Sequence, residues 1–462
     1  MENKKTISRR DFFKIAGAAG MATAGLTACG DRQGSLTSAN AGEPGGEMTY
    51  RTLTGDRVSL LGYGCMRWPM MPNPDGEGQV VDQEEVNRLV DYALAHGVNY
   101  FDTAPPYCQG LSEEATGIAL SRHPRDSYYI ATKMSNHRLY GAGLRGKELH
   151  DASVKMYQDS FKHLRTDYFD YYLFHILGTG AGMEEMRGRL YDCGIADFIL
   201  KEKEAGRIRK LGFSFHGDVR VFDYMLQESG IPWDFVQIQL NYLDWRHASG
   251  INVNAEYLYG ELAKRNIPAV VMEPLLGGRL SKVHDHIVTK LKQRESGQSV
   301  ASWAFRFAGS FPGVLTVLSG MTYMEHLQDN LRTYSPLHPL SEDEFAFLQE
   351  TANLMVQYQT IPCNDCKYCM PCPYGIDIPA ILLHYNKCIN EGNMPRSGQD
   401  EDYRRARRAF LVGYDRSVPK LRQANHCIGC NQCSPDCPQG IDIPKEMQRI
   451  DHFVERLKQD NL

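Results

Sequence analysis

Short apolar segments alternate with amphipathic helices from about Met48 to Leu340, and this alternation constrains the fold more than any other feature of the chain. Eight of the segments have the length of strands and are apolar nearly throughout, as strands buried on both faces are. They are Val58–Gly64, Val98–Thr103, Tyr128–Lys133, Phe169–His175, Ile208–Phe215, Phe235–Asn241, Ile267–Pro274 and Val314–Ser319. Eight strand–helix units predict a closed (β/α)8 TIM barrel rather than an open doubly wound sheet, and the first strand lacks a G-x-G-x-x-G phosphate fingerprint.

The helices between the strands carry their own start and stop signals. Asp82 is expected to cap a helix, with Glu85 three residues later as its capping-box partner, and Gly97 is expected to end it. Residues 176–192, after the fourth strand, form a Gly-rich insertion that is either a lid or a plain loop. A helix from about Ser341 to Tyr358 is expected to connect the barrel to the rest of the chain.

Polar side chains stand at the ends of three successive strands and in one adjoining loop. Asp102 ends the second strand, Tyr107 lies in the following loop, Lys133 ends the third strand and His175 ends the fourth. In (β/α)8 barrels the working residues gather at the C-terminal ends of the strands. Each residue alone fits a structural role, as a helix cap, a packed rim residue, a solvated amine or a core histidine. Their shared position at one barrel mouth favours catalysis.

An acid, a phenol, an amine and an imidazole suit the reduction of a carbonyl group. A carbonyl that accepts hydride becomes an alkoxide and needs a proton, which Tyr107 can donate. The usual pKa of a tyrosine is about 10, and the neighbouring Lys133 ammonium is expected to lower it. Asp102 would orient Lys133, and His175 would hydrogen-bond the substrate oxygen.

Two runs of four cysteines near the end of the chain form an internal repeat. The second run has the spacing C-x2-C-x2-C-x3-C-P, the bacterial ferredoxin pattern for [4Fe-4S] clusters. Zinc is the main competitor for C-x2-C pairs, but four cysteines in each run, the proline after the last one and the duplication favour iron and sulfur. We expect two [4Fe-4S] clusters, with the ligands Cys363, Cys366, Cys369, Cys372, Cys427, Cys430, Cys433 and Cys437.

The cysteines are expected to be shared between the two clusters. In two-cluster ferredoxins the fourth cysteine of each run ligates the other cluster. Cys437 is therefore expected to join the first three cysteines of the first run, and Cys372 the first three of the second. The first run has a shortened gap before Cys372, which leaves the geometry of its loop open. Apolar faces between the runs predict helices, so residues 341–462 are expected to form a connecting helix and an α-helical ferredoxin-like domain.

Residues 1–29 resemble an export signal. The motif Ser8-Arg9-Arg10-Asp11-Phe12-Phe13-Lys14 precedes a Gly/Ala-rich apolar run, as in twin-arginine signals. Leu26-Thr27-Ala28-Cys29 resembles a bacterial lipobox, which predicts a lipid anchor at Cys29. Residues 30–46 are expected to be a flexible linker before a barrel at 47–340. These features predict a periplasmic or extracytoplasmic location in a bacterium; the plainer alternative is a disordered basic tail.

Composition and charge exclude other classes of protein. The chain has 462 residues, of which 42% are hydrophobic and 23% charged, as is ordinary for a soluble globular protein. A net charge of −5 and the lack of a basic stripe argue against nucleic acid as a partner. No internal stretch is long enough to span a membrane. Outside the two runs, four scattered cysteines are expected to be packed in the interior: Cys65, Cys108, Cys193 and Cys388.

The barrel segment resembles the aldo/keto reductase family over about residues 48–335. The resemblance rests on motifs around the four polar residues and on two further strands. These motifs are Tyr100-Phe101-Asp102-Thr103-Ala104, Ile130-Ala131-Thr132-Lys133, Asp167-Tyr168-Phe169-Asp170-Tyr171-Tyr172-Leu173-Phe174-His175, Ile208-Arg209-Lys210-Leu211-Gly212-Phe213-Ser214 and Val236-Gln237-Ile238-Gln239-Leu240-Asn241. The resemblance implies that Tyr107 is the general acid and that Asp102, Lys133 and His175 support it.

The resemblance also implies a site for NADP or NAD. Phe215 stands where the family often has Asn, and His326 stands where many NADP-preferring members have Arg, so the choice of cofactor stays open. A vestigial site is the alternative. The positions that match the family's contacts to the carboxamide, the nicotinamide ring, the phosphates and the adenine are Ser214, Gln237, Met272, Ser319, Gly320, Asp329 and Asn330.

A barrel followed by this cysteine domain resembles the aldo/keto reductases that carry a C-terminal 4Fe-4S domain. The expected protein is an exported iron–sulfur oxidoreductase that acts on a small carbonyl or alcohol substrate. Its clusters would exchange electrons with a redox partner protein or a membrane electron carrier. Two alternatives remain at this stage: an electron-transfer or binding protein with the barrel as a scaffold, and a non-redox enzyme that oxidises its substrate only transiently.

Overall fold

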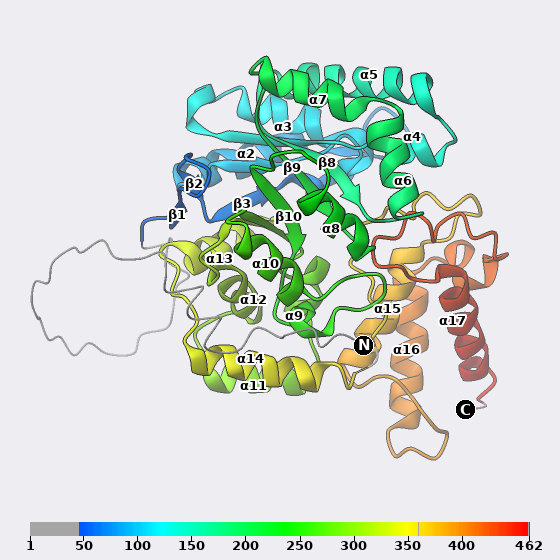
Figure 1. The fold of residues 1–462 in the computed structure, drawn as a ribbon. Coiled ribbons are helices and arrows are strands. Elements are labelled where there is room, and N and C mark those ends of the chain that lie inside the picture. Colours follow the sequence, from blue (N-terminus) through cyan, green and yellow to red (C-terminus); the bar gives the residue numbers. More distant parts are fainter. Residues whose placement is uncertain (1–45, 359, 461) are drawn as a thin grey trace, which may run out of the picture.

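The computed structural model describes residues 46–358, 360–460 and 462. The twin-arginine motif, the lipobox with Cys29 and nearly all of the predicted linker lie outside the described residues. The described chain forms a barrel with a smaller helical domain at its side, drawn in orange and red in Figure 1.

The predicted (β/α)8 barrel is confirmed. Eight parallel strands close in the order β10-β11-β12-β3-β6-β7-β8-β9. All eight fall within or next to the predicted strand segments, because an apolar run bounded by turns is what a doubly buried strand needs. Their bounds are β3 Leu61–Gly64, β6 Tyr100–Asp102, β7 Tyr129–Met134, β8 Phe169–Leu177, β9 Ile208–Phe215, β10 Phe235–Gln239, β11 Ala269–Met272 and β12 Val314–Ser319.

The first predicted strand is interrupted. β2 (Val58–Ser59) pairs antiparallel with β1 (Tyr50–Arg51), and only β3 joins the barrel. The backbone N–H of Ser59 donates to Oδ1 of Asn99 at 2.8 Å, and its hydroxyl donates to the carbonyl of Leu61 at 2.7 Å. Local side-chain hydrogen bonds therefore replace the strand ladder at this point. A second antiparallel pair, β4 (Met70–Pro72) and β5 (Gln79–Val81), follows β3.

Helix α2 (Gln83–Ala95) begins where its capping signal predicts. The Asp82 carboxylate accepts a hydrogen bond of 3.0 Å from the backbone of Glu85. Val86, Leu89 and Val90 on one face are buried against the barrel. The other helices around the barrel are α3 Ser112–Leu120, α5 Gly146–Leu164, α7 Ile195–Glu204, α8 Val219–Gln227, α10 Ala255–Lys264, α11 Asp285–Arg294, α12 Val300–Gly309 and α13 Met324–Tyr334.

Short helices occupy the loops at the C-terminal ends of the strands. The Gly-rich insertion after β8 folds into α6 (Met183–Arg187) and a π-helical turn at Gly188–Asp192. Two further short helices are α4 (His137–Gly141) and α9 (Asp244–His247). The predicted connecting helix is α14 (Glu342–Met355), and a capping box between Ser341 and Glu344 starts it.

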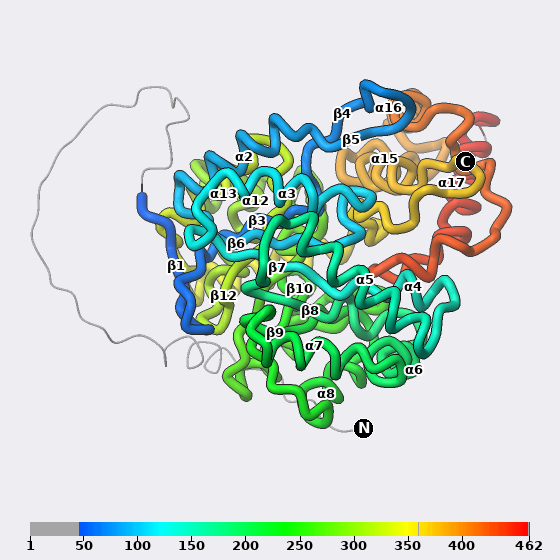
Figure 2. Tube along the Cα trace, turned by 90° about the horizontal axis from the view of Figure 1, so that it is seen from above, coloured from blue at the N-terminus to red at the C-terminus, as the bar shows by residue number. Residues whose placement is uncertain are grey.

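The cysteine domain has three main helices and a core of its own. They are α15 (Ile378–Asn390), α16 (Tyr403–Ser417) and α17 (Ile443–Lys458), which lie together beside the barrel in Figures 1 and 2. The repeated Asp-Ile-Pro motif begins α15 and α17. Asp377 and Asp442 cap these two helices, and a proline occupies the first turn of each. Phe410 and Met447 lie in this second hydrophobic core.

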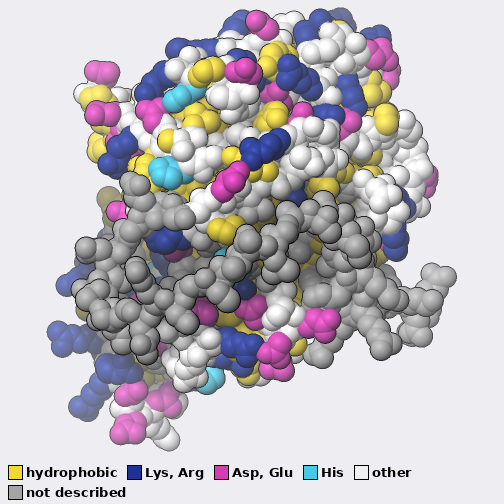
Figure 3. All heavy atoms as spheres, turned by 90° about the vertical axis from the view of Figure 1, so that its left-hand side faces the viewer, with side chains coloured by type: hydrophobic (Ala, Val, Ile, Leu, Met, Phe, Trp, Pro, Cys, Tyr) yellow, Lys and Arg dark blue, Asp and Glu magenta, His cyan; other side chains and the backbone are white. Residues whose placement is uncertain are grey.

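No helix within the described residues is long and apolar enough to cross a membrane. Figure 3 shows one face of the molecule, on which basic and acidic side chains are interspersed over the part that is described.

Candidate active site and cluster sites

The structure brings Asp102 and Lys133 into a buried ion pair. The Lys133 ammonium donates to Oδ1 of Asp102 at 2.5 Å and to the carbonyl of Thr103 at 2.8 Å, and both side chains are at most 3% exposed. Burial raises the pKa of Asp102 and lowers the pKa of Lys133, while each partner opposes the shift of the other. A pair held by two hydrogen bonds in the barrel interior fixes the amine in one position.

Tyr107 lies over this pair. Its ring centroid is 4.9 Å from the Lys133 ammonium and 5.9 Å from the His175 ring. The expectation that Lys133 lowers the pKa of Tyr107 is wrong for this structure. Burial raises the pKa of Tyr107 well above its usual value, and the charges of Tyr368 and Asp102 raise it further. The phenol is therefore held in its protonated form, which is the form of a proton donor.

His175 is a neutral imidazole with a fixed orientation. Burial, followed by the neighbouring His137 and Lys133, holds the pKa of His175 well below its usual value. Its Nδ1 lies 2.7 Å from the Ser135 hydroxyl. If Ser135 donates to Nδ1, then Nε2 carries the proton and can donate it to a substrate oxygen. Ser135, two residues after Lys133, was not identified from the sequence because a lone serine carries no signal.

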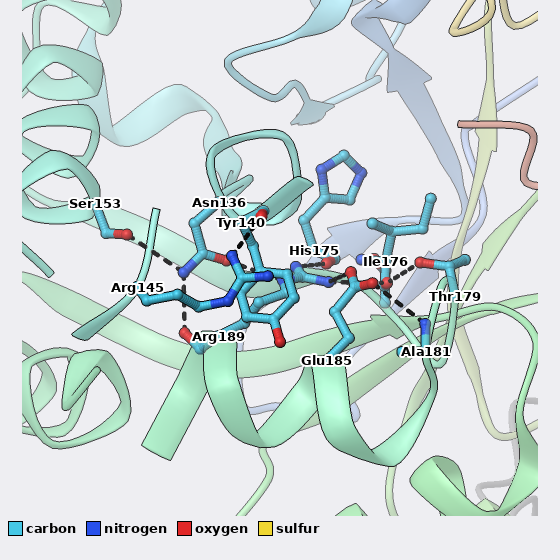
Figure 4. Close-up of polar contacts among 11 residues, drawn as sticks. Asn136, Tyr140, Arg145, Ser153, His175, Ile176, Thr179, Ala181, Glu185 and Arg189 are labelled. Atoms are coloured by element: carbon cyan, nitrogen blue, oxygen red, sulfur yellow. Dashed lines mark hydrogen bonds and ion pairs between the residues drawn. The ribbon is translucent and has the colours of Figure 1, made fainter. Parts of the chain in front are cut away.

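The insertion after β8 supports the strand end that carries His175. Arg189 is fully buried, and its guanidinium donates to the His175 carbonyl at 2.6 Å, to Oδ1 of Asn136 at 3.1 Å and to Oε1 of Glu185 at 3.3 Å (Figure 4). Five donors in one plane allow an arginine to join three elements in this way. The network joins the insertion to the ends of β7 and β8, so these residues form part of the site's framework.

The inner positions of the predicted nicotinamide site lie beside the tetrad. Ser214 is buried near the end of β9, Gln237 is buried opposite it in the middle of β10, and Met272 ends β11. Oε1 of Gln237 and Oδ2 of Asp102 are buried without a hydrogen-bond partner among the described residues. A carboxamide donates two N–H groups, so these unpaired acceptors fit the inner end of a nicotinamide nucleotide.

The outer positions already have protein partners. Asn330 donates to the Ser319 hydroxyl at 2.8 Å, and Asp329 accepts from the Ser299 hydroxyl at 2.6 Å. A Cβ on Gly320 would meet the Arg67 side chain at 3.0 Å. The residues for a phosphate and an adenine therefore lie on one side of the mouth, next to the segment that follows Cys363.

One set of four cysteines lines a single cavity. Cys363, Cys366 and Cys369 of the first run face the same space as Cys437 of the second run. Burial raises the pKa of the Cys363 thiol to about 11 and of the Cys366 thiol to about 12, and Cys437 contributes to both shifts. This is the grouping that the shared-ligand pattern predicts for one cluster.

The second set of four cysteines is identified by the thiols that lie near Cys433. Burial raises the pKa of the Cys433 thiol to about 11, and the thiols of Cys372, Cys427 and Cys430 raise it further. Cys372 of the first run thus lies with the first three cysteines of the second. Across residues 46–358, 360–460 and 462, no three or more His, Cys, Asp or Glu side chains are grouped as a site for a single metal ion. Two sets of four soft thiol ligands fit two [4Fe-4S] clusters.

The cysteine domain lies over the barrel mouth. Arg67 donates to the carbonyl of Asn364 at 2.5 Å, and the Asn364 side chain donates to Oε1 of Glu273 at 2.7 Å. Asn252 donates to Oε1 of Gln439 at 2.9 Å. A Cβ on Gly277 would lie 2.0 Å from the Asn364 carbonyl, so only glycine permits this approach. Both cysteine runs contact the loops that surround the tetrad.

Residues 60–353 match the aldo/keto reductase family, and residues 362–442 match the 4Fe-4S dicluster domain. The first match covers more than half of the chain, and the chain belongs to the aldo/keto reductase family. It is an oxidoreductase of this family with a C-terminal 4Fe-4S dicluster domain.

Two curated relatives illustrate the likeness. The aldo-keto reductase YhdN of Bacillus subtilis is 26% identical over 292 residues, which cover 59% of this chain and 85% of that protein. The L-galactose dehydrogenase of Arabidopsis thaliana is 24% identical over 311 residues, covering 63% and 89%. The solved structure of aldo-keto reductase AKR11C1 from Bacillus halodurans in its holo form superimposes with a TM-score of 0.51 at 24% identity, covering 66% of this chain and 96% of that one. The structural likeness shows the shared barrel fold.

Proposed function

We propose that this protein interconverts a small carbonyl compound and its alcohol at Tyr107, with a nicotinamide cofactor, and exchanges the electrons with a partner through two [4Fe-4S] clusters. The observation that carries this proposal is the contact between the two halves of the chain. Tyr368, between the cysteines Cys366 and Cys369, is near enough to Tyr107 to raise the pKa of that phenol. The proposed proton donor and a loop that carries predicted cluster ligands therefore lie at the same barrel mouth.

The tetrad supplies the proton and positions the substrate oxygen. Tyr107 gives its phenolic proton to the oxygen of the carbonyl as that oxygen gains charge, and takes it back in the reverse direction. The Lys133 ammonium, held by Asp102, stabilises the resulting phenolate. The neutral His175 imidazole holds the substrate oxygen by a hydrogen bond from Nε2, with Ser135 fixing the tautomer.

Ser214, Gln237 and Met272 would hold the nicotinamide end of NADP or NAD, and Ser319, Gly320, Asp329 and Asn330 would hold its phosphates and adenine. When bound, the cofactor supplies or accepts a hydride, and the clusters supply or accept single electrons. The unpaired acceptors of Gln237 and Asp102 support a carboxamide at the inner end. Because the barrel mouth is covered by the cysteine domain, water is kept from the reacting groups.

The proposal extends to location and partner. The arginine pair at Arg9 and Arg10, the apolar run after it and Cys29 support export by the twin-arginine route and a lipid anchor on the extracytoplasmic face of a bacterial membrane. That route carries proteins that have already folded, which suits a chain with inserted clusters. A redox protein or a membrane electron carrier would then accept or supply the electrons.

A visible spectrum of the anaerobically purified protein tests the proposal. We expect the absorbance of oxidised clusters, bleaching on addition of NADH or NADPH, and recovery when a short aldehyde or ketone is added. In Tyr107→Phe the bleaching should persist, while the recovery should slow by at least about 100-fold, since the variant lacks the proton donor.

Tyr129→Phe is the matched control, because Tyr129 begins β7 at the opposite end of the barrel. Its recovery rate should equal that of the wild type. If the absorbance of Tyr107→Phe recovers at the wild-type rate, Tyr107 is not the proton donor. The barrel would then serve as a scaffold for electron transfer. If neither NAD(H) nor NADP(H) binds, the nicotinamide cofactor would have to be removed from the proposal.

A further inference from the structure

The barrel covers one set of cysteines and leaves the other closer to the surface. Cys363 of the first set is buried, and the barrel residue Glu273 accepts hydrogen bonds from Asn364 and Gln439 beside this set. Cys430 of the second set is the one exposed cysteine among the eight predicted ligands. The second set is therefore the one that a partner outside this chain can approach.

Large apolar side chains are exposed around the second set of cysteines. Leu421 is 81% exposed and Ile428 is 64% exposed, more than any other large apolar side chain of the described residues. Leu421 precedes the second cysteine run, and Ile428 lies within it. Tyr374, two residues after Cys372, is 47% exposed. Exposed apolar groups that gather at one place and have polar neighbours mark sites of interaction.

Hydrogen bonds hold these side chains on neighbouring segments of the chain. The Arg422 guanidinium donates to the Gly375 carbonyl at 3.3 Å, so the turn that carries Leu421 lies beside the segment after Cys372. Nε2 of His426 lies 3.1 Å from the Lys420 carbonyl, which joins the same turn to the start of the second cysteine run. We call the exposed side chains of these three segments the Leu421 surface: Tyr374, Lys420, Leu421, Arg422 and Ile428.

The charge around the Leu421 surface is positive. Residues 416–430 contain three basic side chains, Arg416, Lys420 and Arg422, and no Asp or Glu. Two acidic side chains lie next to this segment: Asp377 is 3.7 Å from Arg422, and Asp415 precedes Arg416. The basic side chains outnumber the acidic ones even with these two included. An apolar surface with a positive rim favours a partner that is both apolar and anionic.

We propose that the Leu421 surface binds an anionic lipid bilayer, with Leu421 and Ile428 entering the headgroup region and the basic side chains pairing with lipid phosphates. The proposal rests on the proposed function, in which a membrane electron carrier exchanges electrons with the clusters. Leu421 projects from a single short turn, Lys420–Arg422. A bilayer accepts such a side chain without a pocket of matching shape, whereas a protein interface needs close shape complementarity. Binding would bring the second set of cysteines next to the membrane.

The experiment measures binding of the full chain, with its clusters, to lipid vesicles. Every sample carries Cys29→Ser, so that no lipid chain anchors the protein. The vesicles consist of equal parts phosphatidylglycerol and phosphatidylcholine, or of phosphatidylcholine alone. Sedimentation gives the affinity, and hydrogen exchange of residues 418–431 shows whether the Leu421 surface makes the contact. We expect anionic vesicles to slow this exchange at least about tenfold. Leu421→Ser should weaken binding at least about tenfold, since burial of a leucine contributes that factor or more. Lys420→Gln should weaken binding to the anionic vesicles about fivefold.

Leu53→Ser is the matched control, since Leu53 is also exposed but lies next to β1 on the barrel. It should bind vesicles as the parent protein does, and cluster absorbance should be equal in all samples. Equal binding by Leu421→Ser and Leu53→Ser, or no protection of residues 418–431 by anionic vesicles, would overturn the proposal. Protection of these residues by an acidic plant-type ferredoxin but not by vesicles would overturn it in favour of a protein partner. Vesicle binding through this surface without bleaching by NADH or NADPH would instead contradict the proposed function and leave the membrane surface in place.

Discussion

The Asn364 side chain donates a hydrogen bond of 2.7 Å to Oε1 of Glu273, which joins the first cysteine run to the end of barrel strand β11. The Gln439 side chain donates to both oxygens of the same carboxylate, at 3.3 Å and 3.2 Å. Asn364 follows Cys363, and Gln439 lies two residues after Cys437. One carboxylate of the barrel therefore binds both chain segments that supply the first set of four cysteines.

Removal of this carboxylate is expected to loosen the cysteine domain. Glu273→Ala leaves two buried amide groups without their acceptor, which costs about 1–3 kcal/mol. Hydrogen exchange of residues 363–369 and 437–441 should become faster by about one to two orders of magnitude. Glu273→Gln, which keeps one acceptor oxygen, should restore most of the protection, and the exposed Glu77→Ala should change nothing. Equal exchange in Glu273→Ala and the wild type would mean that this contact does not hold the domain.

The grouping of the cysteines predicts which variants lose the same cluster. Cys437→Ser and Cys363→Ser should remove one common electron paramagnetic resonance signal, although the two residues lie in different runs. Cys372→Ser and Cys433→Ser should remove the other signal. Cys388→Ser is the control, because Cys388 is buried in α15 and outside both sets. If Cys372→Ser and Cys363→Ser lose the same signal, each run holds its own cluster.

The raised pKa of Tyr107 predicts a flat pH dependence of carbonyl reduction. The donor is active when protonated, so activity falls only as the pH rises through its pKa, which burial and Tyr368 hold above the usual value of about 10. We expect kcat to be constant from pH 7 to about pH 10. A decline of kcat between pH 7 and 9 would instead show that Lys133 lowers the pKa during turnover.

His216 predicts a loss of stability in acid. It is buried at the end of β9, its Nδ1 has no hydrogen-bond partner among the described residues, and burial lowers its pKa from 6.5 to about 4. Because the folded pKa is depressed, the unfolded chain binds more protons between those values, and stability falls as the pH is lowered from about 6.5 to 4. The contribution of this group reaches about 3 kcal/mol.

Urea unfolding of His216→Gln at pH 7 and pH 5 measures this effect. The variant should lose less stability than the wild type between the two pH values. His123→Gln serves as the comparison, since this half-buried histidine is paired with Asp91 at the surface. The same pH slope in His216→Gln and the wild type would contradict the assignment of the effect to His216.

The sequence by itself determined the barrel, because each buried strand corresponds to a continuous apolar run between turn residues. It also predicted Asp102, Tyr107, Lys133 and His175 as candidate site residues, since parallel strands bring residues at their C-terminal ends to one mouth whatever the details of packing. The grouping of Cys437 with the first run was predicted from the pattern of two-cluster ferredoxins, and the structure groups these four thiols in that way.

Only the tertiary structure decided what lies next to these residues. Tyr368 raises the pKa of Tyr107, Arg189 donates to the carbonyl of His175, and Glu273 accepts from both cysteine runs. No periodicity or spacing marks these residues, because their contacts join segments that are far apart in the chain and depend on how the cysteine domain docks on the barrel. The direction of the Tyr107 pKa shift was likewise set by the tertiary structure, since desolvation by burial is its largest cause.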